Sequence, residues 1–309
     1  MARINPPESV PAETAPDDPR LGRLLGSRLS QGDAPDAVIL GFPSDEGVRR
    51  NGGRVGAAEG PGAIRNALYR MTPDARFDRL ETLVGRTQDL GDLATSGNVE
   101  EDQRNLGDAL APYLERGAFA IVLGGGHETS YGHFLGYVRA HRQVEILNWD
   151  AHADVRELAQ GQAHSGSPFR QAIQDPSAAC RRYSVAGLQA HSVSRPHLKF
   201  VAEQGRALWA DQLSTETVDE LYLSLTTPAL VSFDLDAVHQ AEAPGVSAPN
   251  PNGLRSELWL HAAYAAGRAP AVTSADVVEL NPRVDRDGQT ARLAALTVWW
   301  LLRGRAERR

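Results

Sequence analysis

Residues 148–154 (NWDAHAD) place two carboxylates and an imidazole at alternate positions directly after the apolar run 144–147. That run predicts a buried strand, so the polar side chains lie where the strand ends. In an extended segment, residues i, i+2 and i+4 project to one side, so Asp150, His152 and Asp154 are expected to converge if the chain stays extended. Carboxylate and imidazole together form a metal-ligand set, although this stretch alone is equally typical of a polar turn.

Two further stretches repeat the arrangement at the ends of other predicted strands. One is residues 124–128 (GGGHE) and the other is residues 232–236 (SFDLD), in which two aspartates again alternate. Six such groups at the ends of buried strands are costly unless something cationic pairs with them. Four carboxylates and two histidines suit two divalent ions of the hard kind, such as manganese, whereas a single zinc ion needs only three or four ligands. The candidate metal ligands are His127, Asp150, His152, Asp154, Asp234 and Asp236.

The motifs G-G-x-H, D-A-H-x-D and S-x-D-x-D stand in the order in which ureohydrolases carry them, and the chain resembles that family of arginases, agmatinases and formimidoylglutamases. Residues 276–282 (DVVELNP) match a fourth family pattern, D-x-x-E-x-N-P, and the resemblance extends from about residue 41 to about residue 282. Finer details resemble the formimidoylglutamase branch, namely residues 45–51 (DEGVRRN), 53–57 (GRVGA), 124–128 (GGGHE), 165–169 (SGSPF) and 243–249 (APGVSAP).

Strands that alternate with helices predict a parallel sheet covered on both faces. The resemblance implies the same α/β class, a three-layer α/β/α fold with a mostly parallel central sheet, as in arginases. Ligands of such folds bind beyond the carboxyl ends of the strands, where every motif falls. The motifs must meet in space and no Gly-, Ser- or Pro-rich linker separates them, so residues 21–309 are expected to form one catalytic domain. Residues 1–20, rich in proline and acids, are expected to form a mobile arm.

Apolar runs and helical spacing predict the remaining elements. The expected strands cover residues 37–42, 119–123, 144–147, 182–187, 230–235 and 271–280, with a short edge strand within 84–92. The expected helices cover residues 60–69, 98–116, 131–141, 198–203, 215–224 and 289–302. Two stretches rich in polar or charged residues, 45–60 and 156–167, are expected to be loops, the second of them over the site.

Composition narrows the classes of partner. The 309 residues are 41% hydrophobic and carry a formal net charge of −7, which allows a large core and gives no basic face for nucleic acid. No apolar run approaches the ~18 residues of a membrane-spanning helix, and the amino terminus lacks a signal region. Cys180 is the only cysteine, which excludes an internal disulfide and fits a reducing compartment. We therefore expect a cytoplasmic protein with a small-molecule substrate and no nucleic-acid or membrane partner, and the resemblance implies a homo-oligomer.

The expected chemistry is hydrolytic. Two divalent ions can hold a bridging water and lower its pKa toward neutrality, so that hydroxide can attack a trigonal carbon bonded to nitrogen. The resemblance implies two manganese ions per chain, with Asp150 and Asp234 bridging both, His127 and Asp154 completing one site, and His152 and Asp236 completing the other.

Three residues are candidates for catalysis, and one of them, Asp154, is also a candidate metal ligand. Asp154, beside the hydroxide, is the expected proton relay to the leaving amine. Glu279 matches the family glutamate that pairs with an amidinium or guanidinium group, although a structural ion pair with an arginine is the other reading. Arginases carry a histidine in an H-G-x-P turn, but residues 164–168 here are HSGSP, so Ser165 takes the aligned position. His164 is therefore a candidate proton shuttle or a side chain that faces solvent.

The branch resemblance implies hydrolysis of N-formimidoyl-L-glutamate to L-glutamate and formamide, a step of histidine degradation. The alternative is an agmatinase-like or guanidino-acid ureohydrolase that releases urea, whose substrate has a cationic or apolar tail. A metal-stabilised binding protein without turnover would be expected to have lost a ligand, and none is missing. Two substrate carboxylates require cationic partners, and each available arginine could instead be an ordinary surface residue. The candidates are Arg49, Arg50, Arg54, Arg156 and Arg170.

Overall fold

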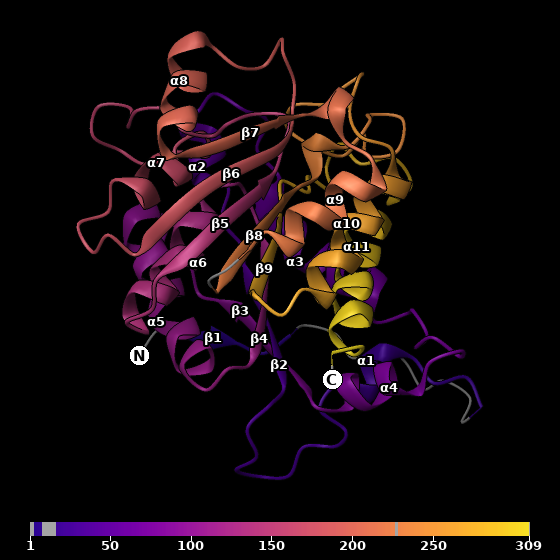
Figure 1. The fold of residues 1–309 in the computed structure, drawn as a ribbon. Helices are drawn as coiled ribbons and strands as arrows, with labels where there is room; N and C mark the ends of the chain where they lie inside the picture. Colours follow the sequence, from indigo (N-terminus) through magenta and orange to yellow (C-terminus); the bar gives the residue numbers. More distant parts are fainter. Residues whose placement is uncertain (1–2, 8–16, 226–227, 309) are drawn as a thin grey trace.

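The computed structural model describes residues 3–7, 17–225 and 228–308, and these residues form one nine-stranded sheet between layers of helices (Figure 1). The strands are β1 (Ile4–Asn5), β2 (Ala37–Phe42), β3 (Thr87–Leu93), β4 (Phe119–Gly124), β5 (Val144–Trp149), β6 (Cys180–Leu188), β7 (Gly205–Trp209), β8 (Ala229–Asp234) and β9 (Val272–Val278). Their order is β1-β3-β2-β4-β9-β8-β5-β6-β7, and every neighbouring pair is parallel except β1 with β3. The mostly parallel sheet expected from the sequence is confirmed.

Helices cover both faces of the sheet (Figure 1). They are α1 (Leu21–Leu24), α2 (Glu46–Arg50), α3 (Gly60–Leu68), α4 (Asp78–Gly85), α5 (Val99–Glu115), α6 (Thr129–Arg139), α7 (Pro168–Ile173), α8 (Arg195–Gln204), α9 (Thr215–Leu223), α10 (Ser256–Arg268) and α11 (Gln289–Arg305). Helices α5 to α8 bury their apolar side chains in one hydrophobic core, and α3, α9, α10 and α11 bury theirs in a second. The two cores lie on opposite faces, which makes the fold a three-layer α/β/α sandwich.

The central strands are buried on both faces because their side chains are apolar at nearly every position. All six residues of β2 are buried, and successive residues enter different cores: Ile39 belongs to one, while Val38 and Leu40 belong to the other. Strands of parallel sheets that are covered by helices have this continuous apolar character. All six residues of β4 are buried as well, so the interior of the sheet is built from continuous apolar runs and not from alternating apolar and polar residues.

Four expectations about elements need correction. Residues 4–5 of the expected mobile arm form β1, because an extended segment gains backbone hydrogen bonds at an open sheet edge without burying much apolar surface. Strand β3 is therefore not at the edge, and residues 8–16 of the arm lie outside the described residues. The stretch 45–60 is not simply a loop, since it contains α2. Strand β7 and helices α1, α4, α7 and α10 are absent from the predicted elements; β7 is half-buried and short, which weakens its apolar pattern.

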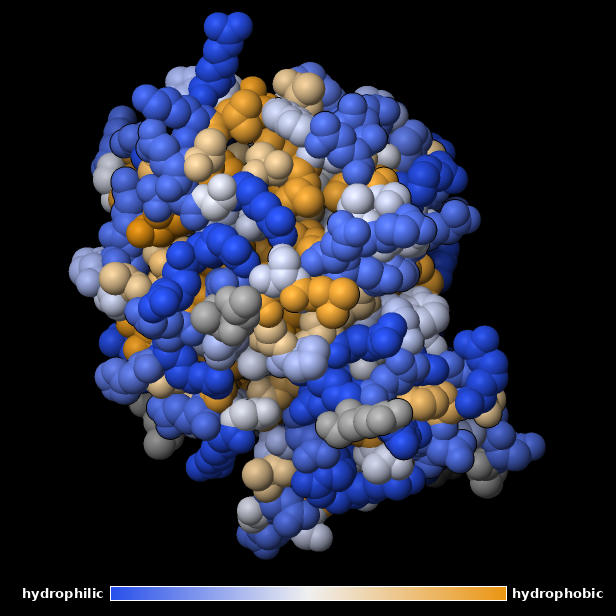
Figure 2. Space-filling model, in the orientation of Figure 1, coloured by the Kyte–Doolittle hydropathy of each residue, from blue (hydrophilic) through white to orange (hydrophobic). Residues whose placement is uncertain are grey.

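The carboxyl ends of the parallel strands point toward the top of Figure 1. Figure 2 shows that this face of the molecule is mainly hydrophilic, with hydrophobic residues gathered in its upper part where β6 and β7 run. Within the described residues, no helix is both long and apolar enough to cross a membrane. The polar motifs that follow the strands therefore lie together at the carboxyl-terminal edge of the sheet, which is the candidate functional site.

Candidate metal centre

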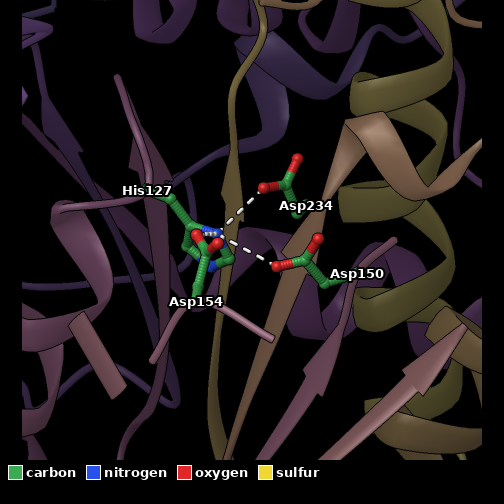
Figure 3. A group of neighbouring side chains, drawn as sticks. All are labelled: His127, Asp150, Asp154 and Asp234. Carbon is green, nitrogen blue, oxygen red and sulfur yellow. Dashed lines mark ion pairs between the residues drawn. The ribbon is translucent and has the colours of Figure 1, made fainter. Parts of the chain in front are cut away.

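The ends of β4, β5 and β8 bring four of the six candidate ligands to one point (Figure 3). Nδ1 of His127 lies 2.9 Å from Oδ2 of Asp234 and 3.0 Å from Oδ2 of Asp154. Oδ2 of Asp150 lies 3.5 Å from the same nitrogen. All but Asp154 are almost completely buried, and the Asp154 side chain is 14% exposed. Asp154 is therefore the member of this group that solvent reaches most easily.

The remaining two candidate ligands form a second group with Asp150. Nδ1 of His152 lies 3.3 Å from Oδ1 of Asp150 and 3.2 Å from Oδ2 of Asp236. Asp150 thus offers one carboxylate oxygen to each group, which is the geometry of a bridging ligand. Asp234, the other expected bridge, lies in the first group alone.

The two groups form because the chain bends where the strands end. Oδ1 of Asp150 accepts a hydrogen bond from the backbone N–H of His152 at 2.7 Å, and Oδ1 of Asp234 accepts one from Asp236 at 2.9 Å. Aspartates commonly close turns in this way. The condition that residues 150–154 stay extended is not met, since Asp154 has a left-handed backbone with φ of 44°. Residues i and i+4 of a strand are about 13 Å apart, so an extended chain would hold them too far apart to share an ion.

The donor atoms fit divalent ions. Nδ1 of His127 is buried and makes no hydrogen bond, although three carboxylate oxygens surround it, and Oδ1 of Asp236 is likewise buried without a partner. Orphaned buried polar atoms are costly, and a cation in each ligand group would supply a partner for them. Imidazole nitrogen and carboxylate oxygen are ligands of manganese and related ions.

The pKa values of the clustered histidines and aspartates also fit a site for divalent ions. Burial opposes a charge on His127, yet the carboxylates of Asp234 and Asp154 raise its pKa well above the usual value. The charge of Asp236 raises the pKa of His152 as well, and burial raises the pKa of Asp236 to about 6. Protons on the histidines therefore offset part of the negative charge of the cluster when no cation is bound. A divalent ion would displace those protons, as metal ions do on binding histidine and carboxylate ligands.

Glu279 lies directly beside the first group. It follows β9 with a left-handed φ of 67°, and its N–H donates to the carbonyl of Gly125 at 2.8 Å. Its Oε1 accepts a hydrogen bond from the backbone N–H of His127 at 2.8 Å. Burial and the neighbouring charges of Asp234 and Glu128 raise the pKa of Glu279 well above its usual value. A cationic substrate group next to it would favour the ionised carboxylate.

His164 is not brought to the cluster. Its Nδ1 accepts a hydrogen bond from the N–H of Gly166 at 3.1 Å, and its Nε2 donates to the carbonyl of Glu157 at 3.0 Å. The side chain is buried, so it does not face solvent either. Both ring nitrogens are used to hold the loop 156–167 in shape, which favours a structural role for His164 over the expected proton shuttle. The sequence could not show these hydrogen bonds, because both partners are backbone groups and their positions depend on how the loop folds.

Two candidate arginines on α2 are engaged by acidic neighbours. Arg49 pairs with Glu46 and keeps a side chain that is 65% exposed. Arg50 pairs with Glu46 at 3.2 Å and with Glu100 at 2.8 Å. Both guanidinium groups are already neutralised, so neither is placed as a free partner for a substrate carboxylate.

The other three candidates differ in their partners. Arg54 donates to two main-chain carbonyls of the segment 243–249, and Arg170 pairs with Glu157 at 3.2 Å. Arg156 donates to the neutral side-chain oxygen of Asn51 at 3.2 Å, and the described residues give it no ion pair. Arg156 follows the candidate ligand Asp154 by two positions and, within the part of the chain that the structure describes, has a neutral partner only.

Glu128 was not singled out as a site residue, yet it is buried between α2 and the turn that carries His127. Its Oε1 accepts the N–H of Gly47 at 2.9 Å, and burial raises its pKa to about 7. A Cβ on Gly47 or Gly126 would lie within 2.5 Å of the Glu128 carboxyl group, so both glycines leave room for it. The sequence signal that could have identified Glu128 is its position next to His127, at the end of a predicted buried strand.

Comparisons with known proteins agree with this geometry. Residues 35–303 match the family described as the arginase family. Formimidoylglutamase of Lysinibacillus sphaericus is 35% identical over 291 residues, which cover 90% of this chain and 87% of the relative. Formimidoylglutamase of Rhodococcus jostii is 37% identical over 310 residues, with coverages of 91% and 93%.

Solved structures give the same result. The crystal structure of Trypanosoma cruzi formiminoglutamase with a pair of Mn²⁺ ions is similar with a TM-score of 0.87 and 32% identity, and the match covers 95% of this chain and 100% of that one. Arginase from Bacillus subtilis is similar with a TM-score of 0.73 and 26% identity, with coverages of 86% and 98%. The motifs, the fold and these matches together show that the chain belongs to the arginase family.

Proposed function

We propose that this chain is a dinuclear-metal hydrolase that converts N-formimidoyl-L-glutamate and water to L-glutamate and formamide, a step of histidine degradation. The observation that carries the proposal is the pair of ligand groups that share Asp150 at the carboxyl end of the sheet. Relatives named formimidoylglutamase, 35% to 37% identical over about nine-tenths of the chain, support the choice of substrate.

The metal proposal assigns two Mn²⁺ ions to each chain. One ion would be held by His127, Asp150, Asp154 and Asp234, and the other by Asp150, His152 and Asp236. Bound there, the two ions would lower the pKa of a shared water, so that hydroxide is supplied at neutral pH. The manganese pair in the similar Trypanosoma cruzi structure supports the choice of metal.

The reaction joins the water oxygen to the formimidoyl carbon and breaks the bond between that carbon and the glutamate nitrogen, which leaves with an added proton. Asp154 is the most exposed carboxylate of its group, and it carries the proton to the leaving nitrogen. Glu279 pairs with the amidinium, because a buried carboxylate stabilises an adjacent cation strongly.

Arg156 gives the site its preference for an anionic substrate tail. It has a neutral partner in Asn51 and lies two positions after Asp154. A hydrogen bond between charged groups is worth about 1.5 to 3 kcal/mol, or roughly ten- to a hundredfold in binding. Agmatine, which carries a positive terminal amine, would lose that contact and meet repulsion in addition.

The test compares kcat/KM for N-formimidoyl-L-glutamate, arginine, agmatine and 4-guanidinobutyrate at identical manganese loading. Formimidoylglutamate should be the fastest substrate, with formamide and glutamate as products. Faster turnover of a guanidino compound with release of urea would move the proposal to an agmatinase-like or guanidino-acid ureohydrolase. No turnover of any of the four, with two ions bound, would overturn both.

Two further parts of the proposal concern the setting of the enzyme. The single cysteine, Cys180, supports a reducing compartment such as the cytoplasm. A homo-oligomer is proposed from the family resemblance, and Trp299 and Trp300, half-buried on α11, are candidates for its contact. Light scattering coupled to size exclusion would give the number of chains directly.

A further inference from the structure

A chain of buried hydrogen bonds leads from His127 away from the metal centre. Nε2 of His127 lies 2.9 Å from Oγ of Ser232, and the same hydroxyl lies 2.5 Å from Oδ1 of Asp276. Ser232 and Asp276 are direct register partners on β8 and β9. Asp276 has no exposed surface and none of its contacts is with a candidate metal ligand, so its contact with the metal centre is indirect.

The other oxygen of Asp276 is contacted by His133 from helix α6. Nδ1 of His133 lies 2.8 Å from Oδ2 of Asp276, and Nε2 of His133 lies 2.7 Å from Oγ of Ser274. The hydroxyl of Tyr137 lies 2.7 Å from the Ser274 hydroxyl and 2.6 Å from Oγ1 of Thr273. His133, Ser274 and Tyr137 are completely buried, so every link depends on protein partners.

The positions of the protons follow from what each group can donate. A carboxylate only accepts, so Asp276 receives the proton of Ser232 on one oxygen and the Nδ1 proton of His133 on the other. Since Ser232 has a single proton, its oxygen must accept from His127. His127 therefore keeps a proton on Nε2, so the proton that a metal ion displaces is the one on Nδ1, which faces the three carboxylates of the first group.

We propose that His133 is a positioning residue for the metal centre. By donating from Nδ1 to Asp276, His133 keeps that carboxylate as the acceptor of Ser232, and so holds His127 in the tautomer that binds a metal through Nδ1. The second ring nitrogen of a metal-binding histidine commonly contacts a carboxylate, which fixes the tautomer. Here a serine and a second histidine extend that arrangement. The inference rests on the proposed metal centre and is independent of the substrate.

Two substitutions separate this role from simple packing. In His133→Asn the amide nitrogen takes nearly the place of Nδ1 and can still donate to Asp276. In His133→Gln the amide reaches the place of Nε2, near Ser274, and the donor to Asp276 is lost. Neither side chain is apolar and both are smaller than or similar to histidine, so a packing role would affect the two variants alike.

The readout is binding of Mn²⁺ to the metal-free protein, followed by electron paramagnetic resonance and by metal analysis after gel filtration. His133→Gln should lose roughly ten- to a hundredfold in affinity for one of two ions, as for other indirect partners of metal ligands, whereas His133→Asn should stay within about threefold of wild type. The ion held by Asp150, His152 and Asp236 should persist in both variants, because His127 is absent from that group. Circular dichroism and thermal unfolding report whether each variant folds.

Unchanged affinity in His133→Gln would overturn this inference alone, as would equal losses in both folded variants. A wild-type chain that binds fewer than two ions would instead overturn the metal centre, and this inference with it. If His133→Gln does not fold, ring ¹⁵N chemical shifts of histidine-labelled wild type loaded with diamagnetic Zn²⁺ decide the matter. His133 should carry its proton on Nδ1, assigned by loss of the signal in His133→Asn, and a proton on Nε2 alone would overturn the proposal.

Discussion

Oε1 of Glu279 accepts the backbone N–H of His127 at 2.8 Å, so the residue proposed to pair with the substrate also fixes the strand end that carries a metal ligand. The bond uses an oxygen that an amide can supply equally well. The other property of Glu279, its negative charge, is the one that an amidinium requires. The two roles can therefore be separated by a single substitution.

Glu279→Gln should leave manganese content nearly intact while raising KM by about ten- to a hundredfold, the range expected for loss of a charged hydrogen bond. Metal analysis and steady-state kinetics at saturating Mn²⁺ measure the two effects. Glu279→Leu serves as the contrasting variant, since it also removes the acceptor of the His127 N–H and should lower metal retention. Equal metal loss in the glutamine and leucine variants would show that Glu279 acts only on the structure.

Asp150 and Asp234 should differ in their effect on metal content. Asp150 belongs to both ligand groups, so Asp150→Asn should weaken both ions and leave well under one ion per chain after gel filtration. Asp234→Asn removes a ligand from the first group only, and one ion should remain. Asp108→Asn, on the exposed ion pair with Arg139, is the matched control and should retain two. A fully loaded Asp150→Asn/Asp234→Asn double variant with unchanged activity would refute the ligand assignment.

Binding of manganese should stabilise the protein more as pH rises. In the metal-free chain the pKa of His127 is raised, so its contribution to stability is complete below the unfolded value of about 6.5 and is lost as pH rises through the folded value. The pKa of Asp236, raised to about 6, has the same sign, but its contribution is already lost near pH 6, so His127 carries the change above that pH. Each proton that the ion displaces adds about tenfold in affinity per pH unit.

Thermal unfolding with and without Mn²⁺ at pH 6, 7 and 8 checks this prediction. The difference in Tm should grow with pH, chiefly because the metal-free protein loses stability. Titration calorimetry in two buffers of different ionisation enthalpy should register proton release at pH 7. A Tm difference that is constant over this range would mean that the cluster holds no protons for the metal to displace.

Sequence reasoning succeeded where the determinants are local. The apolar runs before His127, Asp150 and Asp234 predict buried strands, and the polar residues that follow them end at one edge of the sheet because parallel strands share that edge. The structure gathers all six candidate ligands into two groups. The backbone conformation of residues 150–154 was not predicted, since Asp154 reaches the cluster through a left-handed bend and not through an extended chain.

Features that depend on strand order lay beyond the sequence. Ser232 and Asp276 pair because β8 neighbours β9, and His133 reaches Asp276 because α6 packs over that strand. Neither relation has a signature in residue spacing. His164 is the opposite case. Its residue type suggests catalysis, but both of its ring nitrogens make hydrogen bonds to the backbone of its own loop.

Arg156 should decide between anionic and cationic substrate tails. Arg156→Ala should raise KM for N-formimidoyl-L-glutamate by about ten- to a hundredfold with a smaller effect on kcat, because the contact is made to the tail and not to the reacting carbon. Discrimination against agmatine should shrink by a similar factor, since the repulsive charge is removed. Arg139→Ala, which removes an exposed guanidinium from the surface of α6, should change neither value. Unaltered KM in Arg156→Ala would exclude Arg156 as the carboxylate partner and return the question to Arg54 and Arg170, whose present contacts would then have to open when substrate binds.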